Sequence, residues 1–250
     1  MSDVHQFPSI LLSGVTKTFG RKVAVQKLSL QIPAGELFAF LGPNGAGKTT
    51  TIRMTVGLLR PDHGSVQVCG HFVGTNGLAA KARLAYVPDQ PFLYDKLTGR
   101  EFLYFVAEMY GLSPQRRDDR LETLVHRLDM LEFLDQLSES YSHGMKQKVA
   151  LAAALIHQPA VLVIDEPMVG LDPRTIRTVK DLFLELTRSG GTVFMSTHTL
   201  DIAEAVADRI GIIHRGALIA VGTLADLRAL ATHEQSLEEI FLQLTEASHG

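Results

Sequence analysis

The stretch GPNGAGKTT occupies residues 42–50 and contains the pattern G-x-x-x-x-G-K-[ST]. Its glycines let the backbone turn so that several N–H groups point inward, which suits the binding of anionic oxygens. Lys48 adds a mobile positive charge, and the hydroxyl of Thr49 is a suitable ligand for Mg²⁺. The sequence therefore predicts a site for a nucleoside triphosphate. The candidate contacts are the residues of the stretch: Gly42, Pro43, Asn44, Gly45, Ala46, Gly47, Lys48, Thr49 and Thr50.

The flanks of this stretch predict a strand before it and a helix after it. Residues 37–41 read LFAFL, a continuous apolar run typical of a strand that is buried on both faces. A helix is expected to begin near Gly47 and to run to Leu59, because Arg60-Pro61 and the residues that follow are a strong stop signal. The amino end of this helix would add the positive end of its dipole to the phosphate site.

Two further apolar runs end in residues that suit phosphate chemistry. The run at 161–164 is followed by Asp165 and Glu166, and the run at 192–195 leads to His198. In a parallel sheet such strand ends lie at one edge, where ligands bind, so these side chains would converge on phosphates held by Lys48. The predicted fold class is α/β: a P-loop NTPase core with a mainly parallel sheet, an antiparallel β subdomain and an inserted all-helical subdomain.

Each polar residue at these strand ends has its own candidate role. Asp165 suits the metal, through a coordinated water, and Glu166 is the candidate general base for an attacking water. His198 alone would be a weak signal, because a lone histidine is usually structural, but it stands at a third strand end. With Lys48 neutralising phosphate charge, these residues predict phosphoryl transfer to water.

The remaining patterns divide one domain into parts. Residues 10–32 alternate and are rich in β-branched side chains, with a turn at Gly20-Arg21, so they predict an antiparallel hairpin. Between 90 and 157 apolar positions recur with helical spacing, and Ser113 is expected to be the N-cap of one helix, with Pro114 at its first position. We expect a single domain over 1–250: a core with the β subdomain at 1–89 and 158–225, a helical subdomain at 90–157 and a helical tail at 226–250.

Aromatic residues are concentrated at the start of the helical subdomain. Seven of the seventeen Phe and Tyr residues lie from Tyr86 to Tyr110. Most are expected to form the core of that subdomain. The alternative is a surface that docks an apolar element of a partner.

Composition narrows the choice of partners. The net charge of −3 provides no overall basic field for nucleic acid or anionic lipid. Cys69 is the only cysteine, so an intrachain disulfide is impossible and a reducing compartment is expected. The first nine residues lack the plan of a signal peptide, and no run reaches the ~20 apolar residues of a spanning helix. A role at a membrane would need a separate partner.

The motifs together resemble those of the nucleotide-binding subunit of an ABC transporter. GPNGAGKTT, VLVIDEP, GLDP at 170–173 and STH at 196–198 follow the order and spacing of that family, and the resemblance covers about residues 10–225. It implies ATP and Mg²⁺ as cofactors, and an ATP hydrolase coupled to transmembrane transport. It also implies two cassettes, identical or different, packed head to tail. Each ATP would then lie between the phosphate loop of one cassette and the signature segment of the other.

The resemblance assigns further residues by position. The signature segment is Tyr141-Ser142-His143-Gly144-Met145. Ser142 would donate a hydrogen bond to the γ-phosphate of the partner's ATP, with Gly144 and the helix N-terminus behind it. Asp172 would act across the dimer interface. Phe19 matches the aromatic residue that stacks on adenine, with a buried ring at the hairpin tip as the alternative.

Two segments depart from the common family pattern. The usual signature reads Leu-Ser-Gly-Gly-Gln, whereas this chain has Tyr, His and Met at the first, third and fifth positions. Variants with Ser-x-Gly-Met-Lys occur in bacterial export-type ABC ATPases, which favours an exporter. The family's glutamine loop places Gln directly after the proline of a Tyr-x-Pro element, but here Pro88 is followed by Asp89 and then Gln90. Asp89 fits by position and Gln90 by chemistry as the residue that approaches Mg²⁺.

The resemblance implies an integral membrane permease subunit as partner, a place on the cytoplasmic face of the membrane through that partner, and no nucleic acid. The alternatives are an importer ATPase, a soluble ABC ATPase that acts on nucleic acid or ribosomes, and a regulatory module with incidental turnover. Soluble relatives usually carry two cassettes, coiled-coil insertions or basic extensions, whereas this sequence shows one cassette, no heptad run and a net charge of −3. The retained Lys48, Asp165, Glu166 and His198 argue against an inactive site.

Overall fold

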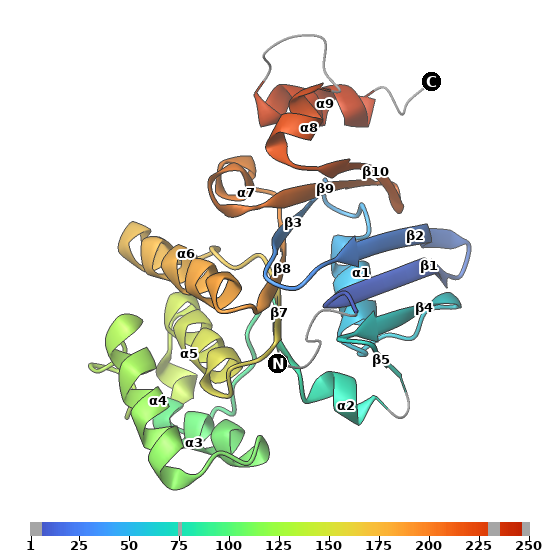
Figure 1. Ribbon diagram of the computed structural model, residues 1–250. Helices are drawn as coiled ribbons and strands as arrows, with labels where there is room; N and C mark the ends of the chain where they lie inside the picture. The colour runs from blue at the N-terminus through green and yellow to red at the C-terminus, as the bar shows by residue number, and fades with distance from the viewer. Residues whose placement is uncertain (1–6, 75–76, 230–235, 247–250) are drawn as a thin grey trace.

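Figure 1 shows the computed structural model of the chain, which describes residues 7–74, 77–229 and 236–246. The strands are β1 (Ile10–Phe19), β2 (Lys22–Ile32), β3 (Leu37–Leu41), β4 (His63–Val68), β5 (His71–Phe72), β6 (Leu84–Val87), β7 (Val161–Asp165), β8 (Thr192–Thr197), β9 (Arg209–His214) and β10 (Ala217–Gly222). The helices are α1 (Lys48–Thr55), α2 (Leu78–Lys81), α3 (Gly99–Met109), α4 (Pro114–Arg127), the 3₁₀ helix η1 (Ser138–Ser140), α5 (His143–Ile156), α6 (Pro173–Arg188), α7 (Leu200–Val206), α8 (Leu224–Ala229) and α9 (Leu237–Glu246).

The larger sheet has the strand order β10-β9-β3-β8-β7-β6. Its strands from β9 to β6 pair in parallel, and β10 joins the edge as an antiparallel partner of β9. The three apolar runs of the sequence analysis are therefore neighbours, β3-β8-β7, and their carboxyl ends lie at one edge. This arrangement confirms the predicted α/β fold with a mainly parallel sheet.

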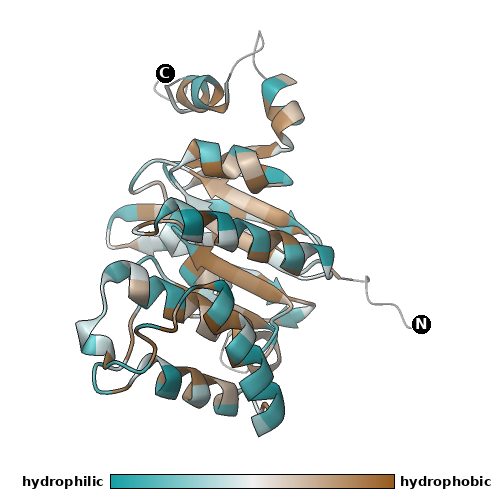
Figure 2. Cartoon of the chain, turned by 90° about the vertical axis from the view of Figure 1, so that its left-hand side faces the viewer, coloured by the Kyte–Doolittle hydropathy of each residue, from teal (hydrophilic) through white to brown (hydrophobic). Residues whose placement is uncertain are grey.

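The apolar runs are continuous because both faces of the parallel sheet are covered. Along β3, Leu37, Ala39 and Leu41 pack with the cluster that includes α3, α4, α5 and α6, whereas Phe38 and Phe40 pack with α1 and the antiparallel strands. All five side chains are fully buried. In Figure 2 the strands through the middle of the chain are mostly brown, while the helices in front of them carry teal on their outward sides.

The antiparallel sheet has the order β2-β1-β4-β5 and contains the predicted hairpin. Phe19 pairs with Lys22 at its tip, across the turn at Gly20-Arg21. Helix α1 lies between this sheet and the parallel sheet in Figure 1. The phosphate loop that precedes α1 is thereby held between the two sheets.

Helix α1 ends at Thr55, earlier than the predicted Leu59. Gly57 adopts a left-handed φ of 77°, and the N–H groups of Gly57 and Leu58 donate to the carbonyls of Met54 and Arg53 at 3.2 and 2.9 Å. These two bonds form a Schellman motif, which closes the helix before the chain reaches Pro61. The prediction was wrong because it took the proline as the stop signal and overlooked the glycine.

The segment between β6 and β7 is helical, as its spacing predicts. Helix α3 begins with a capping box between Thr98 and Glu101, and the predicted cap at Ser113 accepts a hydrogen bond from the N–H of Arg116. Helix α5 buries residues on most of its surface and packs on both α3 and α4. These bounds support our proposal that residues 90–157 form a subdomain.

Within the predicted tail, the structure describes residues 226–229 and 236–246, whereas 230–235 and 247–250 lie outside the described residues. Helix α8 follows β10 directly and contacts it, and α9 contacts α7 and α8. The side chains of Leu237 and Ile240 on α9 are buried. These contacts support the proposal of a helical tail that caps the core.

Tyr141, the first residue of the signature segment, ties that segment to the helical subdomain. Its buried hydroxyl accepts a hydrogen bond from the N–H of Gly99 at 3.0 Å, and the carbonyl oxygens of Phe133, Leu134 and Gln136 lie 2.9, 3.2 and 3.0 Å from it. Burial raises the pKa of the Tyr141 phenol, so the hydroxyl stays protonated and able to donate. A leucine at this position could make none of these bonds.

We predict that Tyr141→Phe lowers the free energy of unfolding by about 1–3 kcal/mol, because it leaves the buried N–H of Gly99 without a partner. Urea titration followed by circular dichroism measures this change. Tyr94→Phe is the matched control, since half of that side chain is exposed. Equal stability of Tyr141→Phe and the parent would show that the hydroxyl does not anchor the segment.

Candidate functional site

A cavity of about 310 Å³ lies at the carboxyl edge of the parallel sheet. It is formed by the hairpin tip, the phosphate loop and the ends of β6 and β7. Its lining residues are Phe19, Lys22, Ala24, Pro43, Asn44, Gly45, Gly47, Lys48, Thr49, Thr50, Asp89, Asp165 and Glu166. Most of the predicted nucleotide and metal residues are therefore brought together in one place.

The phosphate loop adopts a conformation that only glycine accommodates easily. Gly45 and Gly47 have φ values of 78° and 112°. A Cβ atom on Gly47 would lie 2.5 Å from the carbonyl oxygen of Ala24, and one on Gly42 would lie 2.5 Å from that of Ile213. No side chain caps the N-terminus of α1, so the N–H groups of its first turn are available to a phosphate.

Lys48 carries a buried positive charge at the floor of the cavity. Its side chain is 7% exposed, and Nζ donates to the carbonyls of Gly42 at 2.6 Å and Pro43 at 3.3 Å. Burial lowers the pKa of the Lys48 ammonium, while the charges of Glu166 and Asp165 act in the opposite direction. A triphosphate bound here would meet this charge without intervening solvent.

Asp165 is fixed between two hydroxyl groups. Its Oδ2 accepts a hydrogen bond from Thr49 Oγ1 at 2.8 Å, and its Oδ1 accepts one from Ser196 Oγ. Ser196 lies directly opposite Asp165 in the β7–β8 register, and both residues are buried. A hydroxyl beside a carboxylate fits Mg²⁺ that is also bound to substrate phosphates. Among the described residues, no group of three or more His, Cys, Asp or Glu is arranged to hold a metal ion.

Glu166 and His198 form a pair beside this carboxylate. His198 Nδ1 lies 2.8 Å from Glu166 Oε1, and the backbone N–H of Glu166 donates to the carbonyl of Ser196 at 3.0 Å. The other carboxylate oxygen, Oε2, is buried and has no protein partner. This orphaned acceptor is suited to a water molecule, as a general base requires. Glu166 also has a positive φ of 52°, an unusual backbone conformation for a residue other than glycine.

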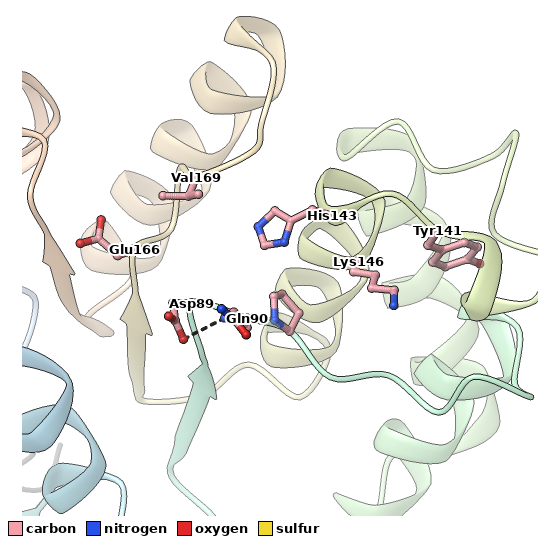
Figure 3. Close-up of a pocket in the computed structure, with 8 residues that line it drawn as sticks. Asp89, Gln90, Tyr141, His143, Lys146, Glu166 and Val169 are labelled. Atoms are coloured by element: carbon pink, nitrogen blue, oxygen red, sulfur yellow. Dashed lines mark hydrogen bonds between the residues drawn. The ribbon is translucent and has the colours of Figure 1, made fainter.

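Asp89 and Gln90 occupy different positions relative to the nucleotide cavity. Asp89 lines that cavity, whereas Gln90 lines only a second cavity of about 480 Å³ that Asp89 borders as well. Asp89 Oδ1 accepts a hydrogen bond from the N–H of Gln90 at 2.9 Å, drawn as a dashed line in Figure 3. The geometry thus places the aspartate, and not the glutamine, in the cavity that Thr49 and Asp165 also line.

Phe19 is exposed over 52% of its surface, so it is not the buried ring that the sequence left as an alternative. It lies at the rim of the nucleotide cavity, and Nζ of Lys17 lies 5.7 Å from the centre of its ring. Lys17 is itself held by Asp62 through an ion pair of 2.7 Å. The ring is thus supported by a fixed cation and remains available to a planar base.

The predicted cross-dimer residues lie away from this cavity. Within the described part of the chain, no residue of 141–146 lines it; Tyr141, His143 and Lys146 border the second cavity instead (Figure 3). Ser142 is the exposed N-cap of α5, and its Oγ accepts from the N–H of Met145 at 3.3 Å. Asp172 caps α6, accepting from the N–H of Thr175 at 2.9 Å.

Sequence reasoning missed Ser196 as a partner of Asp165. The sequence did contain a clue to this role, because Ser196 directly precedes Thr197-His198 at the end of a predicted strand. What the sequence could not supply was the register that sets Ser196 opposite Asp165. Lys22 and Ala24 on β2 were also missed as parts of the cavity wall.

The family model described as ABC transporter matches residues 25–169 of the chain. The chain belongs to the ABC transporter family. It is 38% identical to the linearmycin resistance ATP-binding protein LnrL of Bacillus subtilis (strain 168), over 85% of this chain and 68% of that protein. It is also 38% identical to the daunorubicin/doxorubicin resistance ATP-binding protein DrrA of Streptomyces peucetius, over 88% of this chain and 67% of that protein.

A solved structure described as the ATP binding subunit of an ABC transporter matches with a TM-score of 0.90 and 32% identity, covering 94% of this chain and 99% of that one. Membership of the family makes the chain an ATP-binding subunit that hydrolyses ATP with Mg²⁺ and powers a transporter. A membrane permease and a second cassette follow as its general partners. None of the helices in the described residues is long and apolar enough to cross a bilayer.

We predict that Ser196→Ala raises the Mg²⁺ concentration required for half-saturation about 10- to 100-fold, because the carboxylate of Asp165 loses the hydroxyl that orients it. Electron paramagnetic resonance of Mn²⁺, titrated into the protein with bound ATP, measures the metal affinity independently of turnover. Ser189→Ala removes an exposed hydroxyl at the end of α6 and should leave the affinity unchanged. An unaltered affinity in Ser196→Ala would remove Ser196 from the metal site.

Proposed function

We propose that this chain is the ATPase of an export-type ABC transporter and that it acts in a pair of cassettes packed head to tail. The observation that carries the proposal is the separation of the site into two parts. Lys48, Thr49, Asp165 and Glu166 share one cavity, while Ser142 stands exposed at the N-terminus of α5 outside it. A second cassette, identical or different, would bring its own Ser142 and Gly144 to the γ-phosphate.

The direction of transport rests on the relatives and on the signature segment. The proteins LnrL and DrrA are named for resistance to linearmycin and to daunorubicin and doxorubicin, and removal of a toxic compound is an export function. The variant Ser142-His143-Gly144-Met145-Lys146 agrees with this direction. These observations favour an exporter over an importer. None of them supports a soluble protein that acts on ribosomes or nucleic acid.

Hydrolysis follows from the geometry of the chain's own groups. Oε2 of Glu166 would accept the proton of a water that attacks the γ-phosphate, while His198 holds Oε1 of the same carboxylate. Lys48 would neutralise phosphate charge, and bound Mg²⁺, held near Thr49, Asp165 and Asp89, supplies further electrostatic stabilisation. Phe19 would stack on adenine, and Asp172 would contact the other cassette. Loss of the γ-phosphate would release the two cassettes from each other.

We predict that Glu166→Gln lowers the rate of ATP hydrolysis by about 100-fold or more, because the amide cannot accept the proton of the attacking water. Phosphate release measures the rate. The same variant should accumulate as an ATP-dependent dimer in gel filtration, since bound ATP then stays intact between the cassettes.

Glu139→Gln is the control for this prediction, because Glu139 lies in an exposed ion pair with Lys96. Hydrolysis by Glu166→Gln at the parent rate would contradict the role of the base. A persistent monomer at saturating ATP would contradict the head-to-tail pair.

The helical subdomain offers a surface for the permease. We define the aromatic patch as Phe92, Tyr94, Phe105 and Met109, whose side chains are 77%, 50%, 43% and 66% exposed. The ring of Tyr94 contacts those of Phe92 and Phe105 edge to face, with centroids 5.9 and 6.1 Å apart. Contiguous exposed rings of this kind are typical of an interaction site. The segment 88–98 contains both Asp89, which lines the nucleotide cavity, and two rings of the patch. A movement of the patch would therefore reach the nucleotide cavity through this segment.

We predict that Phe92→Ser weakens binding to the permease about tenfold, because loss of a buried aromatic anchor costs about 1–2 kcal/mol or more. Co-purification from membranes with a co-expressed candidate permease measures binding. Phe72→Ser is the control, since Phe72 is 64% exposed on β5, away from the patch. Equal recovery of both variants would place the permease elsewhere, and no recovery of a membrane protein by the parent would contradict the transporter. Binding at this patch would hold the chain at the cytoplasmic face of the membrane as a peripheral subunit.

A further inference from the structure

The signature segment packs directly on the loop that follows Glu166 in the same chain. A Cβ atom on Gly144 would lie 2.7 Å from the carbonyl oxygen of Gly170, and one on Gly170 would lie 2.4 Å from Cδ2 of His143. A Cβ atom at 144 would collide with backbone, and one at 170 would displace the His143 ring at a φ of 76° that already favours glycine. The ring of His143, which stands where the family usually has glycine, therefore rests on the backbone of Gly170.

A second contact lies one turn further along α5. Gln147 is fully buried, and its Nε2 donates to the carbonyl oxygen of Pro167 at 3.4 Å. Residues four apart share one face of a helix, so His143 and Gln147 meet the loop from the same side of α5. Oε1 of Gln147 is buried without a partner, and a buried unpaired acceptor is unfavourable. This side chain is held where it is by the contact with Pro167 and by the packing around it.

The loop at 167–170 is short and internally bonded. The N–H of Val169 donates to the carbonyl of Glu166, and that of Leu171 donates to the carbonyl of Met168, both at 3.3 Å. Glu166 itself has the positive φ of 52° and is tied to β8 through Ser196. Few residues separate these contacts from Glu166, so we expect a displacement of α5 to change the orientation of Glu166.

We propose that His143 and Gln147 are positioning residues that couple the two ATP sites of the dimer through the interior of one chain. This inference rests on the proposed head-to-tail pair. In that pair Ser142 of a subunit completes the ATP site of its partner, whereas Glu166 of the same subunit serves its own ATP. When the partner's ATP binds at the N-terminus of α5, the helix moves. His143 and Gln147 transmit this movement to the loop at 167–170, and the loop orients Glu166 for hydrolysis.

The coupling can be followed with a reporter on the loop. Val169 is 44% exposed, and Cys69 is the only cysteine. Cys69→Ser with Val169→Cys therefore allows an environment-sensitive fluorophore to be attached beside Gly170. In a Glu166→Gln background, ATP should change its emission as the dimer forms. Adding His143→Ala should abolish most of this change while gel filtration shows the same amount of dimer.

The kinetics of His143→Ala provide an independent measure. With Glu166 intact, kcat should fall about tenfold, because a misplacement below 1 Å loses part of the 100-fold effect that a full 1 Å can cause. KM and the affinity for a fluorescent ATP analogue should stay at the parent values, because Ser142 and Gly144, which would contact the partner's ATP, are retained and His143 does not line the nucleotide cavity of its own chain. His126→Ala, which removes an exposed histidine from the last turn of α4, is the matched control and should change none of these quantities.

The contact itself is tested by a pair of substitutions. Gly170→Ala alone should lower kcat strongly, since its Cβ would collide with the His143 ring and the φ of 76° disfavours alanine. Combining it with His143→Gly removes the ring, so the double variant should recover part of the lost rate. Additive losses in the double variant would overturn the contact.

Two results would overturn the coupling. An emission change that survives His143→Ala would show that the loop responds without this contact. A weaker dimer or a raised KM in His143→Ala would show instead that the imidazole acts on the partner's ATP. Absence of an ATP-dependent dimer in the Glu166→Gln parent is a separate outcome, because it refutes the head-to-tail pair itself.

Discussion

Asp165 and Ser196 lie opposite each other because β7 and β8 pair in parallel register, and the nucleotide site depends on that pairing. The register sets the carboxylate between the hydroxyls of Ser196 and Thr49. It also carries Glu166 to the carbonyl of Ser196 and to the ring of His198. A slip of one residue would exchange the two faces of the strand and remove these groups from the cavity. The chemistry of the site is therefore built into the sheet.

The same architecture leaves the site open to one side. On one side of the site, an anion would contact groups of the same chain, namely the backbone N–H groups at the start of α1 and the buried charge of Lys48. The exposed cap at Ser142 lies outside this cavity, and its neighbours Tyr141 and His143 border a second cavity together with Asp89 and Glu166. In a pair of cassettes, each chain would thus contribute to both sites. The contacts of His143 with Gly170 give such shared sites a physical connection inside one chain.

Much of the fold was predictable because apolar runs, glycines and caps act locally. The strands β3, β7 and β8, the hairpin at Gly20 and the cap at Ser113 follow from such patterns. The end of α1 was mispredicted, because a left-handed Gly57 competes with the proline signal. The candidate site was predictable where strand ends carry its residues. The sequence could not predict three other features, because they depend on packing between distant segments. These are the choice between Asp89 and Gln90, the exposure of Phe19 and the position of the His143 ring.

The two faces of the parallel sheet bury separate cores, and alternate residues of a single strand belong to different ones. The face with Phe38 and Phe40 packs with α1, behind the phosphate loop, while the face with Leu37 and Leu41 packs with the cluster that continues into the helical subdomain. Substitutions on the outward surface of the subdomain would leave the core behind the phosphate loop unchanged. Such a division would let a surface that recognises a permease diversify during evolution while that core stays constant, and it would make this subdomain a natural unit for exchange between related ATPases.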